Sequence, residues 1–359
     1  GGGNTLLPGA LRSRSTNPDL TWEKTYQTNF GFDASLFNHK LALSFDYFHK
    51  KTDNMLVEKP YIATIGEGGY CWYNGGSMVN KGVEITAEWR QSINKDFSYS
   101  IGLNATVMKN EVTDLMDDIY YTWGGGNGID KSIVGQSLGS WMGYKTDGIF
   151  RTQEEVDAYK AEYKVSFGNP AVGRVRYVDT NGDNEINDRD RTWLGTDLPK
   201  AQFGLNLGAN WKGFDLSLFF NSIIRDAWNN SKYYTDFFPL WTGNHGIQLL
   251  EASNAYDRFL QTGYYDSDVP APAVDNSNNE NESSEYFIED GSFIRLKTLS
   301  LGYTLPEKWR KTLRLQNARI YFQAQNLLTL TKYSGADPEG LGYPYALPRQ
   351  YTFGIQFGF

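Results

Sequence analysis

Residues 97–107 read Phe-Ser-Tyr-Ser-Ile-Gly-Leu-Asn-Ala-Thr-Val, with an apolar residue at every odd position and a polar residue or glycine at every even one. Because successive side chains of a β-strand point to opposite faces, this alternation predicts a strand with one apolar and one polar face. Similar segments recur along the chain and predict nine strands, at residues 21–37, 41–50, 77–90, 96–109, 200–211, 214–224, 291–304, 318–330 and 348–359. Each is long enough for the roughly 9–11 residues with which a tilted strand crosses a membrane.

The composition favours strands and turns over helices. The 359 residues include 24 Tyr, 21 Phe, 10 Trp and 37 Gly, and these residue types suit pleated surfaces and tight turns. With a hydrophobic fraction of 40% and a mean hydropathy of -0.53, the chain has little apolar material for a thick core. A barrel with lipid outside and polar side chains inside needs no such core. No run reaches the roughly 18 apolar residues of a spanning helix, so any membrane crossing is expected to use strands.

Charge and cysteine content exclude several classes of protein. A net charge of -8 argues against a nucleic-acid partner, because such a surface must attract phosphate. A single cysteine, Cys71, rules out an intrachain disulfide, a thiolate zinc site and an iron-sulfur cluster. The first residues, Gly1 to Asn4, carry no export signal. We therefore expect either a cytoplasmic protein or a piece of a longer chain.

The connections between the predicted strands alternate in length. Short turns follow the first, third, fifth and seventh strands, whereas long connections occupy about 51–76, 110–199, 225–290 and 331–347. Short turns on one side and long loops on the other are typical of outer-membrane barrels. Aromatic residues gather on the apolar faces at the short-turn side, as an interfacial girdle would; they are Trp89, Phe97, Trp211, Phe214, Phe357 and Phe359.

An odd number of strands predicts an incomplete barrel. Bacterial single-chain barrels use even strand counts, so nine strands are not expected to close alone. Further strand-like pieces at 137–150 and 173–178 come as a pair and leave the parity unchanged. The sequence is therefore predicted to be the C-terminal portion of a longer barrel chain.

An ordered series of strings from residue 17 to the end resembles the C-terminal half of SusC/RagA-type TonB-dependent transporters. The strings are Asn17-Pro-Asp-Leu-Thr-Trp-Glu-Lys24, Gly76-Ser-Met-Val-Asn-Lys-Gly-Val-Glu84, Gly135-Gln-Ser-Leu-Gly-Ser-Trp-Met-Gly-Tyr-Lys-Thr-Asp-Gly-Ile-Phe150, Phe293-Ile-Arg-Leu-Lys297, Leu301-Gly-Tyr-Thr-Leu-Pro306, Gln325-Asn-Leu-Leu328 and the terminal Phe359. Their shared order makes the resemblance more specific than any one string.

The resemblance implies an all-β fold, a 22-stranded barrel in the outer membrane of a Gram-negative, Bacteroidota-like bacterium. In that family an N-terminal plug fills the barrel, TonB drives import, and a SusD-like surface lipoprotein helps to capture oligosaccharides or peptides. Residues 1–359 would supply the last nine strands, with 110–199 and 225–290 as long extracellular loop regions. The plug and the TonB box are expected to lie outside this sequence. Expected partners are the SusD-like lipoprotein, TonB, outer-membrane lipid and a glycan or peptide cargo.

The segment 179–190 has the spacing of a calcium loop. Counting Asp179 as position 1, oxygen-bearing side chains stand at positions 1, 3, 5, 9 and 12, and position 7 can offer its carbonyl, which suits Ca²⁺ or Mg²⁺. The candidate ligands are Asp179, Asn181, Asp183, Glu185, Asn187 and Asp190. Asn184 replaces the usual glycine, and Asp190 is shorter than the usual glutamate. A structural cation and a merely solvated acidic turn both remain open.

Aromatic side chains in the long connections are the candidates for cargo binding. An aromatic ring offers an apolar platform to a sugar while neighbouring polar groups bind its hydroxyls. The candidates are Tyr70, Trp72, Tyr73, Tyr120, Tyr121, Trp123, Trp228, Tyr233, Tyr234 and Trp241. The alternative for each ring is that it packs one loop against another.

Catalysis finds little support, and the protein is not expected to be an enzyme. None of the three histidines has a metal-binding or nucleophile context. Residues 153–163 are predicted to form a short helix, 275–285 a mobile loop and 124–128 a flexible loop tip. Two other functional classes remain open. One is a secreted β-rich glycan-binding module with a dockerin-like calcium loop, whose apolar faces would form a core; the other is a glycoside-cleaving enzyme with paired carboxylates.

Overall fold

The fold is known from a computed structural model. The structure describes residues 16–60, 70–116, 121–122, 125–126, 133–229, 232, 247–273, 276–340 and 345–359. Within these residues, no helix has both the length and the hydropathy that a membrane-spanning helix needs.

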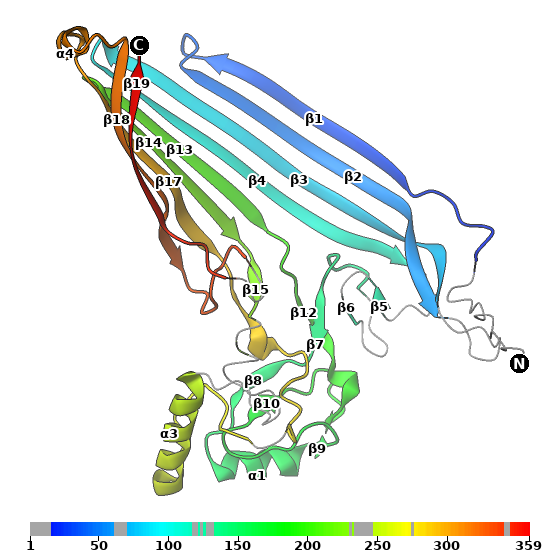
Figure 1. Ribbon diagram of the computed structural model, residues 1–359. Helices are drawn as coiled ribbons and strands as arrows, with labels where there is room; N and C mark the ends of the chain where they lie inside the picture. Colours follow the sequence, from blue (N-terminus) through cyan, green and yellow to red (C-terminus); the bar gives the residue numbers. More distant parts are fainter. Residues whose placement is uncertain are drawn as a thin grey trace, which may run out of the picture.

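A single sheet of nine antiparallel strands dominates the molecule, in the order β1-β2-β3-β4-β13-β14-β17-β18-β19 (Figure 1). The strands are β1 (Lys24–Leu36), β2 (Leu41–Pro60), β3 (Tyr70–Asn94), β4 (Phe97–Leu115), β13 (Ala201–Trp211), β14 (Phe214–Ile224), β17 (Phe293–Thr304), β18 (Asn317–Thr331) and β19 (Gln350–Gly358). Each of the nine predicted strands is present, and neighbours in this order follow one another along the chain. The predicted nine-stranded portion of a barrel wall is confirmed.

The short turns lie together at one end of the sheet, near the C-terminus, and the long connections lie at the other end (Figure 1). Lys212 and Gly213 join β13 to β14 with φ angles of 46° and 89°, the left-handed geometry that suits a two-residue hairpin. The turn between β17 and β18 carries a short helix, α4 (Glu307–Thr312). The alternation of short and long connections is therefore confirmed in space.

Strands β2 and β3 are longer than the sequence predicted. Residues 51–60 and 70–76 continue the two strands, so the expected long connection at 51–76 is wrong and only 61–69 lie between them. Likewise, β4 continues to Leu115. Polar residues occupy both faces in these extensions, which removes the alternating pattern. The hydrogen-bond ladder nevertheless continues, because residues 70–74 of β3 pair with residues 56–60 of β2, and Gly76 pairs with Leu115 of β4.

The strand register joins the apolar positions into one continuous face. Phe32 lies opposite Phe45, which lies opposite Ile85, which lies opposite Ala105, which lies opposite Phe203. Directly opposed residues in antiparallel strands point to the same side of the sheet. One row nearer to the short turns crosses all nine strands; it consists of Leu36, Leu41, Trp89, Ile101, Leu207, Leu218, Leu299, Ala324 and Tyr351.

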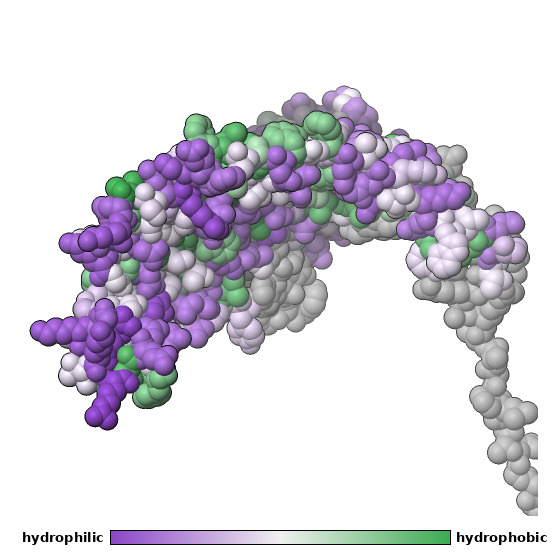
Figure 2. Space-filling model, turned by 90° about the horizontal axis from the view of Figure 1, so that it is seen from above, coloured by the Kyte–Doolittle hydropathy of each residue, from purple (hydrophilic) through white to green (hydrophobic). Residues whose placement is uncertain are grey.

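This apolar face is bare. The relative exposures of Ile101, Leu103, Leu216 and Ile355 are 43%, 41%, 36% and 62%, so no second layer covers them. Seen from above, the sheet bends into an arch with hydrophobic side chains along its outer edge (Figure 2). Large exposed apolar surfaces mark contact with another apolar phase, as the strand pattern predicts.

The predicted aromatic girdle lines up at the short-turn end. Phe97 lies opposite Trp211, Trp211 opposite Phe214, and Phe214 opposite Tyr303. The rings of Phe214 and Tyr303 are 4.5 Å apart between centroids. Four neighbouring strands thus carry aromatic side chains at one height, as expected at a membrane interface.

The described parts of the long connections after β4 and β14 fold into a compact unit, here called the loop body (residues 133–199, 247–273 and 276–290), below the sheet in Figure 1. Its elements are β7 (Trp141–Gly143), β8 (Thr146–Ile149), α1 (Gln153–Glu162), β9 (Lys164–Val165), β10 (Val175–Tyr177), β11 (Glu185–Ile186), β12 (Thr192–Gly195), α3 (Ile247–Thr262) and β16 (Ile288–Asp290), with 3-10 turns at Asp188–Asp190 and Glu285–Phe287. Three further short strands are β5 (Tyr121–Thr122), β6 (Gly125–Gly126) and β15 (Asp226–Trp228). Of the flexible tip predicted at 124–128, the structure describes only β6, which pairs with β5.

Among the described residues, the buried hydrophobic cluster lies in the loop body, although single buried apolar residues also occur in the sheet. The cluster includes Tyr144, Phe150, Val156, Tyr177 and Tyr265. The predicted helix at 153–163 is confirmed as α1, whose N-cap Thr152 accepts a hydrogen bond from the Glu155 N–H. The strand-like pieces at 137–150 and 173–178 form β7, β8 and β10, and β8 pairs with β10 outside the main sheet. The number of strands in the main sheet therefore stays odd, as predicted.

The mobile loop predicted at 275–285 is wrong for the described residues 276–285. Asn278 and Glu280 are only 2% and 5% exposed. Glu280 forms an ion pair of 2.8 Å with Arg174, and the Asn278 amide donates to the Val175 carbonyl. A polar composition resembles a disordered segment, but here the polar side chains are buried and hydrogen-bonded.

Candidate functional site

The opposite face of the sheet is polar. Ser44 lies opposite Thr86, Thr86 opposite Asn104, Asn104 opposite Gly204, and Gly204 opposite Asn221. Hydroxyl and amide groups along this face can exchange hydrogen bonds with water or a polar solute. The sheet thus has one apolar and one polar face, and the loop body lies at one end of it.

Three of the predicted cargo-binding aromatics lie in a strand rather than a loop. Tyr70, Trp72 and Tyr73 belong to β3, because that strand begins earlier than predicted. The Trp72 side chain remains 37% exposed. Tyr121 lies in the two-residue strand β5.

Trp228 packs within the protein. It lies in β15, its ring stacks on Phe287 at 5.1 Å, and Trp141 lies 5.8 Å away. For this ring the structure supports loop-to-loop packing. The other candidates, Tyr120, Trp123, Tyr233, Tyr234 and Trp241, lie outside the described residues.

The loop 179–190 is held closed by its own backbone amides. The Asp179 carboxylate accepts the N–H groups of Gly182 and Asn184 at 2.7 and 2.8 Å. Asn184 has a φ of 57°, so asparagine adopts the left-handed conformation for which glycine is usual. Asn181 accepts the Asp183 N–H at 2.9 Å. These contacts close a tight turn.

The remaining candidate ligands also have protein partners. Asp183 accepts the Glu185 N–H at 2.9 Å, and Glu185 pairs with Lys164 at 2.9 Å. Asn187 accepts the Arg189 N–H. Within the described part of the chain, no three His, Cys, Asp or Glu side chains are grouped to hold a metal ion. Cation binding by this loop remains a prediction.

Asp190 anchors the loop from inside. It is fully buried, and its carboxylate accepts the N–H groups of Thr180 and Asn187, both at 2.9 Å. Burial raises the pKa of Asp190, although these two hydrogen bonds act in the other direction. The twelfth position therefore stabilises the loop by capping backbone groups.

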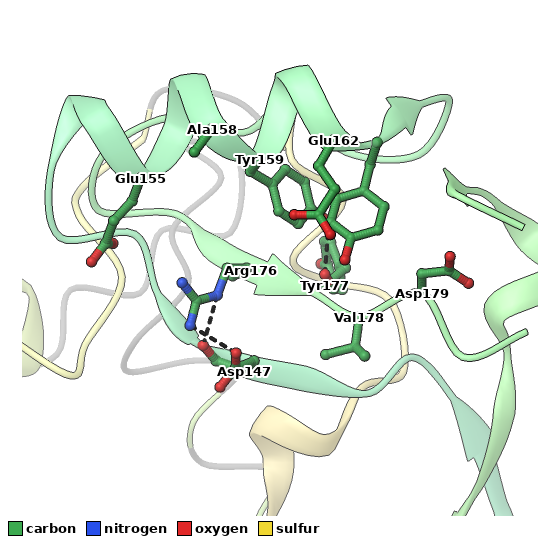
Figure 3. A pocket seen from close by; sticks show the side chains of 10 residues that line it. Asp147, Glu155, Ala158, Tyr159, Glu162, Arg176, Tyr177, Val178 and Asp179 are labelled. Atoms are coloured by element: carbon green, nitrogen blue, oxygen red, sulfur yellow. Dashed lines mark hydrogen bonds and ion pairs between the residues drawn. The ribbon is translucent and has the colours of Figure 1, made fainter. Parts of the chain in front are cut away.

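A groove of about 320 Å³ lies on the loop body between α1 and β10 (Figure 3); of its lining residues, the sequence suggested only Asp179. Tyr159 projects from α1 and Tyr163 follows as its C-cap. The Tyr159 hydroxyl donates to the Tyr177 carbonyl at 2.7 Å. The Arg176 guanidinium pairs with the Asp147 carboxylate at 2.8 Å. Burial raises the pKa of Tyr159. The groove offers aromatic faces beside several charged groups.

A buried charge network ties the last long connection to the polar face of the sheet. Arg295, in β17, donates to Asp337 and Glu339 at 2.7 and 2.6 Å. Lys297 also pairs with Glu339, at 2.7 Å. Burial raises the pKa of Asp337, but hydrogen bonds from the Leu347 N–H and Arg295 outweigh it and hold that pKa below its usual range. Sequence reasoning missed this network because no spacing links residues about forty positions apart.

Comparisons with known proteins agree with this architecture. The family model described as "TonB dependent receptor-like, beta-barrel" matches residues 2–327. The TonB-dependent receptor P3 of Formosa agariphila is 30% identical over 99% of this chain and 36% of its own length. The TonB-dependent receptor SusC of Bacteroides thetaiotaomicron is 28% identical over 95% of this chain and 32% of its own length. The chain thus spans about a third of the curated relatives it matches.

A solved structure shares the fold. The RagAB peptide importer in its "open-open" state superposes with a TM-score of 0.72 and 28% sequence identity, over 97% of this chain and 36% of that chain. The structure of the RagAB peptide transporter gives a TM-score of 0.69 at the same identity.

Proposed function

The chain belongs to the family of TonB-dependent receptor-like β-barrels, and from this membership we propose that it is part of an outer-membrane importer of oligosaccharides or peptides, driven by TonB. The observation that carries the proposal is the bare apolar face that continues across nine strands, with a polar face behind it. Such a wall fits a barrel that faces lipid outside and an aqueous passage inside. Its mechanism is gated passage rather than bond chemistry.

The same face argues against a secreted binding module. That alternative required the apolar strand faces to pack into a protein core, whereas Ile101, Leu103 and Ile355 are exposed on the surface of the sheet. The relatives are named as receptors and importers, which also favours transport over glycoside cleavage.

A surface lipoprotein of the SusD type is the proposed partner. Relatives named SusC and RagAB support this choice, and the loop body, with its own core, offers a rigid surface on the long-loop side. In the proposed cycle, cargo is held between this side and the lipoprotein until TonB, acting on the N-terminal part of the protein, opens the passage.

Aromatic side chains at the long-loop end are the proposed cargo contacts. Among the predicted set, Trp72 combines partial exposure with a place near the end of β3. The tyrosine-lined groove of the loop body adds a second aromatic surface. Aromatic platforms of this kind suit sugars and peptides alike, so both cargo classes belong in the test.

Gene deletion in the source bacterium tests the proposal. The deletion strain should lose growth on one class of polymer-derived nutrient, either oligosaccharides or peptides, while growing normally on monosaccharides and free amino acids. The tagged full-length protein should remain in the outer-membrane fraction and co-purify with a lipoprotein in mild detergent. Recovery in the soluble fraction, or uptake of every tested nutrient unchanged by the deletion, would refute the proposal.

A further inference from the structure

At the long-loop side, the apolar face ends at three basic side chains on adjacent strands. His49 of β2 lies opposite Lys81 of β3, and Lys81 lies opposite Lys109 of β4. We call these three residues the basic row. The last apolar row, two residues nearer to the short turns on each strand, consists of Tyr47, Val83 and Val107.

The basic row points to the same side as the apolar residues. Side chains two positions apart on a strand share a face, and the pairing of these strands is unbroken from the apolar rows to Lys81 and Lys109. Lys81 is exposed, and 62% of the Lys109 side chain is exposed. Neighbouring strands lie about 4.8 Å apart, so the backbone positions of the two lysines and the histidine fall within a span of about 10 Å.

The backbone that carries the basic row is rigid. The row does not lie at the frayed ends of strands, because β2 continues to Pro60, β3 starts at Tyr70 and β4 continues to Leu115. The sheet thus holds the side chains at a fixed height above the apolar band. A ligand that spans both would find the site already formed, which lowers the cost of binding.

A groove of about 230 Å³ opens beside Lys109. It is lined by apolar groups, including Trp193, Leu198 and Pro199, by a further lysine, Lys200, and by Met108 and Asn110, the neighbours of Lys109 on the opposite face of β4. Trp193 is 38% exposed and its indole N–H donates to Ser140 at 2.9 Å. An anchored tryptophan beside lysines at the edge of an apolar band is typical of a lipid headgroup region.

Carboxylates neutralise only part of this surface. Lys109 pairs with Glu111 at 2.7 Å, and Lys200 pairs with Asp226 at 2.8 Å. Both pairs are solvent-exposed and therefore weak, so a phosphate can compete for the ammonium groups. Glu111 lies near both Lys109 and Lys81, and its single charge leaves these two lysines with a net positive charge.

We propose that the basic row binds the phosphate of a lipid headgroup in the leaflet on the long-loop side, with the groove beside Lys109 receiving part of the same lipid. Ammonium groups form strong charge-assisted hydrogen bonds with phosphate oxygens, and the adjacent apolar rows cover the acyl chains. This combination favours a lipid over free phosphate. The inference rests on the proposed placement of the apolar face in the membrane.

Binding of a phosphorylated glycolipid to the full-length protein tests the site. Diphosphoryl lipid A in mixed detergent micelles is the probe, and the affinities of wild type and of the double variant Lys81→Gln/Lys109→Gln are compared by native mass spectrometry. Two lysines near a charged lipid surface predict a loss of about thirty-fold. The conservative variant Lys81→Arg/Lys109→Arg should bind within about threefold of wild type.

A matched control removes the same charge elsewhere. Lys50, next to His49, is on the polar face, and Lys95 is in a short turn at the other end of the sheet; Lys50→Gln/Lys95→Gln should bind like wild type. The heat-dependent gel mobility of each variant verifies a folded barrel. Equal losses in both double variants, or no loss in the first, overturn the proposal. Inorganic phosphate that competes at the concentration of the lipid would indicate a free-anion site and also overturn it. Nutrient uptake is measured separately, so failure here leaves the transport proposal intact.

Discussion

Arg295 Nη2 lies 2.7 Å from Asp337 Oδ1, and only 3% and 5% of the two side chains are exposed. The other guanidinium nitrogens donate to Thr329 at 2.9 Å and to Glu339 at 2.6 Å. The Asp337 carboxylate in turn accepts the N–H groups of Glu339 and Leu347, both at 2.9 Å. One buried ion pair therefore organises the connection between β18 and β19 and fixes it to the sheet.

Replacing Asp337 by alanine is expected to release this connection. Arg295 would keep its charge in a buried site without its principal partner, and breaking a buried pair costs about 3 kcal/mol. Limited proteolysis of the full-length protein, read by mass spectrometry, should show faster cleavage within 332–349. The control Glu307→Ala removes an exposed pair with Lys311, whose side chains are 68% and 76% exposed, and should change little. Equal cleavage rates in wild type and Asp337→Ala would contradict the anchoring role.

The same connection should loosen in acid. Burial raises the pKa of Glu289, but the Ser334 N–H and the Lys232 ammonium outweigh it and hold that pKa below its ordinary value of 4.5. The pKa of Asp337 is also lowered. A carboxyl with a lowered folded-state pKa stabilises the fold above its unfolded pKa, and this stability is lost as pH falls through the folded value. Hydrogen exchange of residues 332–340, corrected for its intrinsic pH dependence, should lose protection below about pH 4.5; protection that grows on acidification would reverse the assigned sign.

Charge on the apolar face should be far more harmful than charge on the polar face. Leu103 is near the middle of the apolar stretch of β4, and its neighbour Asn104 points the other way, opposite Gly204. Arginine at the midplane on a lipid-facing position costs about 2–4 kcal/mol, so Leu103→Arg should impair barrel formation and Asn104→Arg should not. Urea unfolding in lipid vesicles measures the difference. A larger loss in Asn104→Arg would mean that the two faces are assigned the wrong way round.

The stabilisation by a cation bound in loop 179–190 can be measured separately from the stability of the turn itself. Asp183→Asn keeps a side-chain oxygen for the Glu185 N–H but removes a charge that Ca²⁺ would need. Without calcium, the two proteins should unfold at the same temperature. With calcium at a hundred times its dissociation constant, wild type should gain about 2.7 kcal/mol, and Asp183→Asn much less. The unfolding temperature of the loop body in both proteins is measured with calcium and, as the reference, with EDTA. A wild-type unfolding temperature that does not change at millimolar calcium would contradict cation binding.

The sequence by itself determined the nine strands of the sheet and which side chains lie on its apolar and polar faces. A period of two along residues such as 97–107 is a local property, and it places each side chain on one face whatever the strand pairs with. Turn lengths are equally local, so the separation of short and long connections could be predicted as well. In the loop 179–190, Asn184 adopts the left-handed conformation that glycine usually provides at this position, whereas cation binding there stays a prediction.

Only the tertiary structure decided what becomes of the polar long connections. Glu280 is buried because it pairs with Arg174, which is 106 residues away in the sequence. Asp337 is buried because it pairs with Arg295 of β17. The extensions of β2 and β3 likewise depend on ladder partners rather than on alternation. A polar residue has the same local pattern whether it faces water or a distant counter-charge, and burial depends on which groups the fold brings next to it.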